Sequence, residues 1–119
     1  NITRDFYYVK DTARILGNMI GNEKIIGKLF NLGTSCEIKI GDVIKIISNF
    51  MIDYNPKIEN LPDRPADVPR LWVNNNKISQ LIDISSEISF SKGILNTISY
   101  YKKLHEIGDL VEKVPKINW

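Results

Sequence analysis

The stretch of the chain that most restricts its fold is residues 63–77, where prolines stand at positions 65 and 69 among charged side chains. Proline fixes its own φ angle and has no backbone N–H, so this stretch is expected to be a stiff, irregular loop. The loop holds Arg64, Asp67 and Arg70 close together in the sequence. A guanidinium in a fixed position offers two parallel N–H donors, which is typical of a site that binds an anion.

Length and composition predict one small domain. The chain has 119 residues and a net charge of +2, too little to favour nucleic acid or a membrane surface as a partner. Its single cysteine, Cys36, excludes an internal disulfide, and a single histidine, His105, leaves too few of the usual ligands for a structural zinc site. We therefore expect no bound metal, no nucleic-acid partner and no membrane partner.

Neither end of the chain suggests export. No apolar run approaches the roughly 18 residues of a membrane span, and the first residues lack the basic and apolar regions of a signal peptide. The first residue is not Met, so the sequence is expected to begin inside a longer, cytoplasmic protein.

Periodicity predicts an α+β fold in which small sheet pieces pack with about three helices. Strands or extended segments are expected at residues 2–9, 28–32, 37–40 and 57–61. Helices are expected at residues 12–20, 41–51, 76–82 and 89–104, with one further possible turn at 109–113.

Local signals set the predicted helix ends and faces. Asp11 is expected to cap the first helix and Ser89 the last, while Gly21 closes the first helix. The predicted buried faces of the three main helices are Ala13, Leu16, Met19 and Ile20; Val43, Ile47, Phe50 and Met51; and Ile94, Leu95, Ile98 and Tyr101.

No complete catalytic site is visible in the sequence. The glycines at 17, 21 and 27 do not have the spacing of a dinucleotide-binding turn, and no phosphate-binding Gly-x-x-x-x-Gly-Lys loop occurs. His105 is expected to be a surface residue, and Cys36 a small, partly buried apolar side chain. We assign no catalytic residue to the chain.

Three arginines remain as candidate anion ligands: Arg4, at the first strand, and Arg64 and Arg70, in the loop. Arginines from separate segments can converge on a diphosphate. The alternative is that each one pairs with a nearby aspartate, Arg4 with Asp5 or Asp11 and Arg64 with Asp63 or Asp67.

The order of the motifs resembles the C-terminal lobe of the extended short-chain dehydrogenase/reductases, the NAD(P)-dependent epimerases and dehydratases of nucleotide sugars. The resemblance covers residues 3–103. It rests on Arg-Asp-Phe-Tyr-Tyr-Val-Lys-Asp at 4–11, Phe-Asn-Leu-Gly at 30–33, Glu-Ile-Lys-Ile-Gly-Asp-Val at 37–43, Arg-Pro-Ala-Asp at 64–67, and Ser-Phe-Ser-Lys-Gly-Ile at 89–94. The family's Ser or Thr cap on the second helix is replaced here by Lys39, which cannot accept hydrogen bonds.

The resemblance implies roles for four residues. Arg4 and Arg64 would bind the diphosphate of a nucleotide sugar, Asp67 would reach its ribose, and Asn31 would contribute a hydrogen bond near the phosphates. Residues 1–104 would be this substrate-binding lobe, and residues 105–119 a C-terminal extension.

The family's cofactor fingerprint and catalytic Tyr-x-x-x-Lys belong to an N-terminal Rossmann lobe. Neither occurs here, since no Tyr is followed four positions later by Lys. The resemblance therefore implies that NAD or NADP is bound by the missing Rossmann lobe, that this chain binds no cofactor, and that the parent enzyme forms a possible homodimer. The alternative is a stand-alone, non-catalytic remnant that acts as a binding or protein-interaction module.

Overall fold

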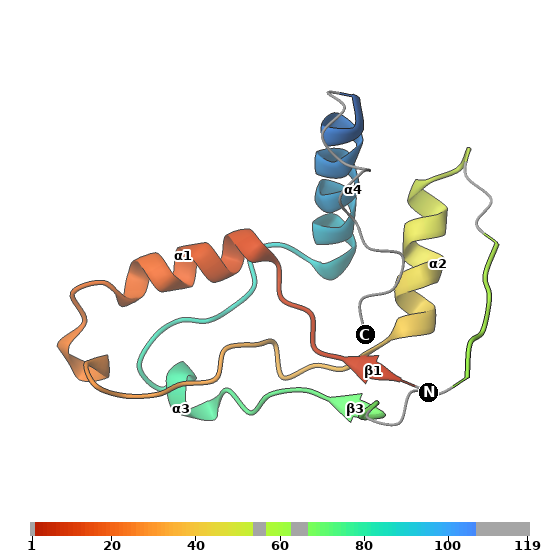
Figure 1. The fold of residues 1–119 in the computed structure, drawn as a ribbon. Helices are drawn as coiled ribbons and strands as arrows, with labels where there is room; N and C mark the ends of the chain where they lie inside the picture. Colours follow the sequence, from red (N-terminus) through yellow and green to blue (C-terminus); the bar gives the residue numbers. More distant parts are fainter. Residues whose placement is uncertain (1, 54–56, 63–66, 107–119) are drawn as a thin grey trace.

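The described residues form a small α+β structure of four α-helices and a short, three-stranded sheet, with the sheet beside α2 and with α1 and α3 extending away from it (Figure 1). The computed structural model describes residues 2–53, 57–62 and 67–106. The elements are β1 (Thr3–Arg4), α1 (Val9–Met19), the 3-10 turn η1 (Glu23–Ile25), β2 (Ile38–Lys39), α2 (Ile40–Phe50), β3 (Arg70–Leu71), α3 (Asn76–Ser79) and α4 (Phe90–Glu106). The α+β expectation is confirmed at this level.

The sheet joins three distant parts of the chain in the order β2-β1-β3. The central strand β1 pairs antiparallel with β2 and parallel with β3, so Thr3 lies opposite both Lys39 and Arg70. Further backbone bonds extend the pairing, from Ile40 N to Ile2 O at 3.0 Å on the β2 side, and from Thr3 N to Pro69 O at 2.9 Å and Asp5 N to Leu71 O at 3.1 Å on the β3 side. The sheet thereby fixes the first strand against the proline-rich loop.

The strands are shorter than the sequence predicts. Of residues 2–9, only Thr3 and Arg4 are strand, and Val9 already belongs to α1. Residues 28–32 and 57–61 were expected to be strands and are not. In the first of these segments, the Leu29 carbonyl is bonded by a side chain, since Lys77 Nζ donates to Leu29 O at 2.8 Å.

Helix α1 differs from expectation at its start and in its orientation. Its N-cap is Tyr8, and Asp11 lies one turn inside the helix, buried, where its carboxylate accepts bonds from the backbone N–H groups of Glu87 and Ile88. Asp11 therefore ties α1 to a remote segment and does not cap the helix. The predicted buried face is also wrong: Leu16 and Ile20 are exposed, and Ile15 is fully buried instead. Gly21 follows the helix with a positive φ of 78°, as expected.

The other long helices match their predicted ranges, whereas the side chains predicted to form their buried faces are at most half-buried. Helix α2 is one residue displaced from the predicted range 41–51, and its N-cap Lys39 makes no side-chain capping bond. At the start of α4, Ser89 Oγ accepts a bond from Lys92 N at 3.4 Å, which confirms Ser89 as the cap. The helix continues past position 104 to Glu106. Tyr101, predicted to be buried, is 52% exposed, and residues 109–113 lie outside the described part of the chain.

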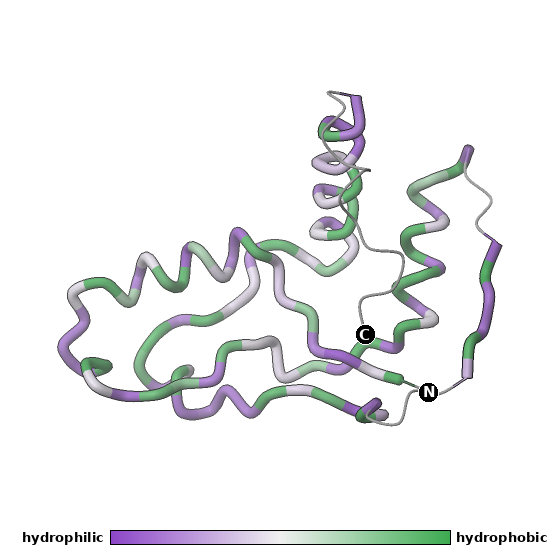
Figure 2. Tube along the Cα trace, viewed as in Figure 1, coloured by the Kyte–Doolittle hydropathy of each residue, from purple (hydrophilic) through white to green (hydrophobic). Residues whose placement is uncertain are grey.

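The core is small for a chain of this length. Among the described residues, the fully buried large side chains are Ile15 and Ile78, while many apolar residues remain in contact with solvent. Figure 2 shows that hydrophobic residues occur in all the long helices and in the segments between them. Cys36, expected to be partly buried, is exposed. His105 is exposed in the last turn of α4, as expected of a surface residue.

Candidate functional site

Arg4 lies in the central strand, and its guanidinium reaches the end of the proline-rich loop. Its Nη1 donates to Thr3 O at 2.7 Å and to Val68 O at 2.9 Å. A guanidinium has five N–H donors, and these two bonds use both hydrogens of Nη1. Within the described residues, the Nε and Nη2 atoms of Arg4 make no hydrogen bond. Arg4 pairs with neither Asp5 nor Asp11 there, so the expected alternative of a local ion pair does not describe it.

The other three predicted ligands, Asp67, Arg64 and Asn31, differ in where they lie relative to Arg4. Asp67 is half-buried and directly precedes Val68, the residue that Arg4 contacts. Arg64 lies in residues 63–66, outside the part of the chain that the structure describes. Asn31 is exposed between Leu29 and Gly33, both of whose carbonyls accept bonds from the region of α3, from Lys77 and Asn75. Arg4 therefore contacts the residue next to Asp67, whereas the segment that carries Asn31 lies beside α3.

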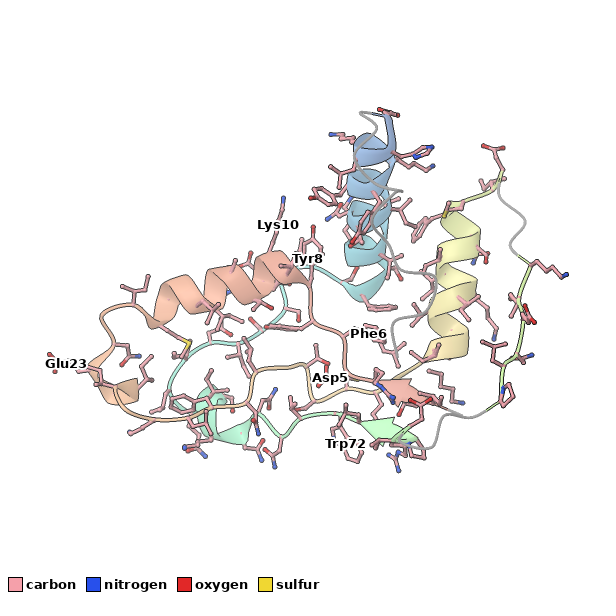
Figure 3. The ribbon with its side chains drawn as sticks, viewed as in Figure 1. Asp5, Phe6, Tyr8, Lys10, Glu23 and Trp72 are labelled. Atoms are coloured by element: carbon pink, nitrogen blue, oxygen red, sulfur yellow. The ribbon has the colours of Figure 1, made fainter. Side chains whose placement is uncertain are left out.

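Asp5, next to Arg4, is the residue whose importance the sequence did not reveal. Its carboxylate accepts bonds from Thr34 N at 3.0 Å, from Ser35 N at 3.0 Å, and from the Thr34 hydroxyl. The Val73 amide lies 3.5 Å from the same carboxylate. Asp5 thus joins β1 to the 33–35 turn and to the segment after β3 (Figure 3).

Gly33 is required for this close approach. A Cβ at position 33 would lie 2.4 Å from Val73 Cγ2 and 2.7 Å from Asp5 Oδ2, shorter than any real contact. The Phe-Asn-Leu-Gly motif therefore ends in glycine for a packing reason. The signal that could have indicated Asp5 is the same motif, because a glycine fixed by close approach requires a partner segment.

Arg70 is committed to a different partner. Its guanidinium forms an ion pair with Glu37, which also accepts a bond from the Thr3 hydroxyl. These bonds lower the pKa of Glu37 to about 2, with the Arg70 bond as the largest cause. Arg70 also lies 4.9 Å from the ring of Trp72, which is 47% exposed.

Arg70 and Arg4 project from opposite faces of the sheet. Thr3 lies opposite Arg70 and binds the same carboxylate, so their side chains share one face. Successive side chains of a strand alternate between faces, which places that of Arg4 on the other. Of Arg4 and Arg70, Arg4 is the one whose guanidinium contacts the backbone beside Asp67.

A second group of polar contacts holds the start of α1. Arg14 donates to Ser85 O at 2.6 Å and lies 3.5 Å from Asp11. Its Nε is 3.0 Å from the Glu87 carboxylate, an ion pair without the alignment of a hydrogen bond. Tyr7 donates to Ile84 O at 2.5 Å, and burial raises the pKa of its hydroxyl. Arg14 and Tyr7 hold the start of α1 against residues 84–87, and we assign neither of them a role in binding a substrate.

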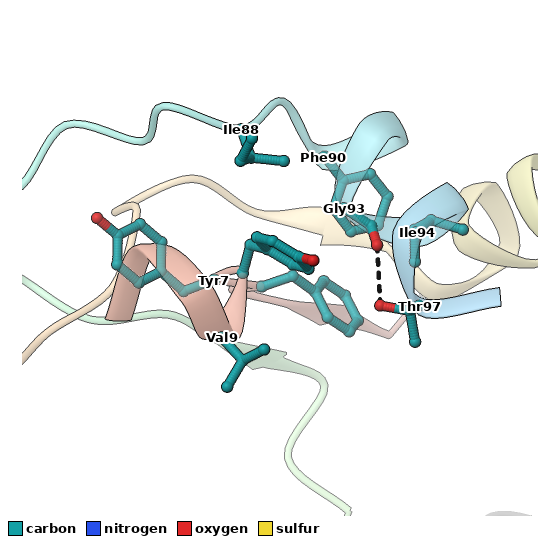
Figure 4. Close-up of a pocket in the computed structure, with 9 residues that line it drawn as sticks. Tyr7, Val9, Ile88, Phe90, Gly93, Ile94 and Thr97 are labelled. Carbon is teal, nitrogen blue, oxygen red and sulfur yellow. Dashed lines mark hydrogen bonds between the residues drawn. The ribbon is translucent and has the colours of Figure 1, made fainter. Parts of the chain in front are cut away.

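An apolar pocket of about 390 Å³ lies between the segment after β1 and the first turns of α4 (Figure 4). Its walls include Phe6 and Phe90, whose ring centroids are 5.4 Å apart. Gly93 lies against Tyr8, where an added Cβ would be 3.2 Å from the Tyr8 ring. The lining offers no group of acids, bases or nucleophiles, and its character is that of a packing surface.

The described residues contain no group of three or more His, Cys, Asp or Glu side chains that could hold a metal ion. In the same part of the chain, no helix has the length and apolar character needed to cross a membrane.

Comparison with known proteins identified relatives for most of the chain. It is 32% identical over 106 residues to a UDP-glucuronate 4-epimerase of Thermodesulfobacterium geofontis, covering 87% of this chain and 32% of the relative. It is 31% identical over 109 residues to a dTDP-glucose 4,6-dehydratase of Escherichia coli, covering 82% of this chain and 30% of the relative.

A third relative is an uncharacterized UDP-glucose epimerase, YtcB, of Bacillus subtilis. It is 25% identical over 105 residues, which cover 87% of this chain and 33% of the relative. The chain thus spans about a third of the length of the curated relatives it matches. No family model matches the chain, and no solved structure matches it.

Proposed function

We infer the function of this chain from its family: it belongs to the extended short-chain dehydrogenase/reductases, the family of nucleotide-sugar epimerases and dehydratases. We propose that it is the C-terminal, substrate-binding lobe of such an enzyme and that it binds the diphosphate of a nucleotide sugar. The observation that carries the proposal is the position of Arg4, in the central strand with its guanidinium against the residue that follows Asp67.

The chemistry of Arg4 suits this role. Nη1 is occupied by two backbone carbonyls, which hold the guanidinium plane in one orientation. The remaining Nε–H and Nη2–H groups form the edge of a guanidinium that binds two oxygens of a phosphate at once. Arg64 would supply the second guanidinium from the loop that leads to Asp67, and Asp67 would accept a bond from the ribose. Asn31 has the weakest support, because its segment is bonded to residues at α3 and not to the strand that carries Arg4.

Asp5 would keep this site in shape. The bonds from Thr34 and Ser35 hold the turn beside β1, and the backbone bond from Asp5 N to Leu71 O holds β3 on the other side. The strand that carries Arg4 is therefore fixed before a ligand arrives. Preorganisation of this kind lowers the entropy cost of binding.

The reaction itself would belong to the rest of the parent enzyme. The chain contains no Tyr-x-x-x-Lys motif and no glycine-rich cofactor turn. We propose that an N-terminal Rossmann lobe binds NAD or NADP and carries the catalytic residues. This lobe would act on the hexose while the present chain holds the nucleotide end.

The names of the relatives indicate which nucleotides to test first. The two epimerases are named for UDP-glucuronate and UDP-glucose, and the dehydratase is named for dTDP-glucose. We therefore propose a uridine or thymidine diphosphate sugar as the ligand, with GDP and CDP sugars as the comparison set.

Calorimetric titration of the chain with UDP-, dTDP-, GDP- and CDP-glucose tests the proposal. Arg4→Ala should weaken binding about 10- to 100-fold, because a charge-assisted, bidentate contact contributes about 1.5–3 kcal/mol. Arg70→Ala is the matched control, since this arginine is committed to Glu37 on the opposite face of the sheet. Equal affinity in the wild-type chain and in Arg4→Ala would contradict the proposal.

A further inference from the structure

A trough lies between the start of α1 and the side of α4. Residues 6–10 line one wall, and residues 88–103 line the other. The trough consists of the apolar pocket in Figure 4 and a second pocket of about 560 Å³. The two pockets adjoin, because Tyr8, Val9 and Thr97 line both of them. This hollow is here called the α1–α4 trough.

The two ends of the trough differ in chemistry. One end is apolar, with the rings of Phe6 and Phe90 5.4 Å apart and Ile94 in the same lining. The other end is lined by Lys10, at the start of α1 (Figure 3), and by Lys103 of α4. Phe90 and Lys103 belong to the same helix, whose rise of about 1.5 Å per residue separates the two ends by about 20 Å. The trough thus has an apolar end and a cationic end.

The polar groups at the cationic end have no partner in the part of the chain that the structure describes. There, neither lysine side chain forms an ion pair or a hydrogen bond, and no carboxylate lines either pocket. The side-chain amide of Asn96 and the hydroxyls of Tyr100 and Tyr101 line the same end and are also without a hydrogen bond to the described residues. A lysine offers three donors and no acceptor. This end is therefore suited to a group that carries negative charge and acceptor oxygens.

We propose that the α1–α4 trough binds an amphipathic anion, a molecule with a long apolar chain and a carboxylate or phosphate at one end. The apolar chain would lie against Phe6 and Phe90, and the anionic head would lie between Lys10 and Lys103. The volumes of the two pockets, about 390 and 560 Å³, are in the usual range for small-molecule sites. Arg4 lines neither pocket, so this site is separate from the diphosphate site and does not depend on the proposed function.

The two ends would contribute differently to binding. Burial of the apolar chain supplies most of the affinity, since each partly exposed lysine is screened by solvent and contributes little. The lysines decide the sign of the head group, because both would repel an ammonium. The expected ligand is therefore an anion with a chain, and neither a short anion nor a cationic amphiphile is expected to bind well.

Calorimetric titration of the chain with dodecanoate, below the concentration at which it forms micelles, tests the proposal. One dodecanoate should bind per chain. Dodecylammonium, which has the same apolar chain and the opposite charge, should bind about tenfold more weakly or less. Acetate, which lacks the chain, should show no binding. The tighter ligand of dodecanoate and dodecyl phosphate identifies the preferred head group.

Lysine variants locate the head group. Lys103→Gln should weaken the binding of dodecanoate about three- to tenfold, because a partly exposed ion pair is lost. Lys102→Gln is the matched control, since it removes the same charge from the preceding position of α4 but lines a different pocket, with Phe50 and Asp53. The affinity of this control should stay within about twofold of the wild type.

A third variant tests the position of the apolar chain. Thr97 is exposed and lines both pockets, so Thr97→Trp places a large ring at their junction. It should weaken the binding of dodecanoate about tenfold or more, because the ring takes the space of the apolar chain. Circular dichroism checks that the variant keeps its helix content.

Equal affinity for dodecanoate and dodecylammonium, equal effects of Lys103→Gln and Lys102→Gln, or many molecules bound per chain would overturn the proposal. Binding that appears only after truncation at Glu106 would assign the trough to residues 107–119, and an affinity that falls as the protein concentration rises would assign it to a second copy of the chain. Both of these results would overturn it as well. Arg4→Ala should leave the binding of dodecanoate unchanged, so failure of this site and failure of the Arg4 site are distinguishable.

Discussion

The region around β1 and the exposed side of α1 differ in how many of their side chains find partners within the chain. Around β1, the Asp5 carboxylate, the Glu37 carboxylate and the Arg70 guanidinium all find partners from distant segments. At the two ends of α1, Val9 and the C-cap Ile20 remain 70% and 85% exposed. These polar groups around β1 are paired within the chain, whereas these apolar side chains are in contact with solvent.

This difference separates two physical requirements. Buried polar groups must be paired inside the folded chain, because an unpaired one costs about 1–3 kcal/mol, so the sheet has to close before any partner arrives. Exposed apolar side chains are common on protein surfaces and have a smaller free-energy cost, so they can stay in contact with solvent until a partner binds. A lobe of a larger enzyme is expected to show both features.

The largest contrast lies within α1, between neighbouring residues. Ile15→Ala should destabilise the chain by about 2–4 kcal/mol, because Ile15 is fully buried and its loss leaves a cavity. Leu16→Ala should change the free energy of unfolding by less than about 0.5 kcal/mol, since Leu16 is 54% exposed. Urea denaturation measures both. Equal losses would mean that Leu16 is packed as closely as Ile15.

The next largest loss of stability is expected around β1, at Asp5. Asp5→Ala removes the acceptor for the amides of Thr34 and Ser35 and should cost about 2–3 kcal/mol. Asp42→Ala is the control, because Asp42 is exposed and makes only a surface ion pair with Lys45 at 3.2 Å, which contributes little. If the two variants unfold at the same urea concentration, Asp5 does not hold the three segments together.

A pair of glycine substitutions tests the close approach at the same place. Gly33→Ala should cost about 1–3 kcal/mol, because its Cβ would overlap Val73 Cγ2. Gly17→Ala, within α1 and with nothing within 4 Å of the added Cβ, should stabilise the chain by about 0.5–1 kcal/mol. Thermal unfolding followed by circular dichroism should therefore shift in opposite directions.

The smallest effect is the pH dependence carried by Glu37. Its pKa in the folded chain is about 2, below the ordinary value of 4.5, so folding favours the ionised form. The resulting stabilisation is complete above about pH 4.5 and is lost as the pH falls towards 2. Glu37→Gln should show a weaker loss of stability between pH 5 and pH 3 than the wild type. Glu59→Gln, at an exposed position, should keep the wild-type dependence.

The sequence predicted the elements whose signals are local. Helix α2 and the start of α4 follow from apolar periodicity and, at Ser89, from a capping side chain. The turn after α1 follows from Gly21. Each of these signals acts within a few residues, so a reading of the chain alone recovers it.

Long-range bonds account for the parts that the sequence did not predict. Asp11 has the residue type and position of a cap, but its carboxylate binds the backbone at 87 and 88. Residues 28–32 have strand composition, but Lys77 supplies a bond that replaces strand pairing. The burial of Ile15 in place of Leu16 depends on which side of α1 the domain occupies, and periodicity cannot choose between two apolar faces.

The candidate site was predicted unevenly for a similar reason. The motifs indicated Arg4 and Asp67, and Arg4 contacts Val68, the residue after Asp67. They did not indicate that Asp5 would join three segments, because its partners at 34, 35 and 73 are distant in sequence. The roles of Arg64, Asn31 and Asp67 in binding stay predictions.

The measurement that most directly tests the proposed diphosphate site is NMR of the arginine Nε–H groups of the ¹⁵N-labelled chain during titration with UDP. The Nε–H signal of Arg4 should shift on binding, while that of Arg70, held by Glu37 on the opposite face, should stay in place. A shift at Arg70 with Arg4 unchanged, or no shift at either, would contradict the assignment of Arg4 as a ligand of the diphosphate.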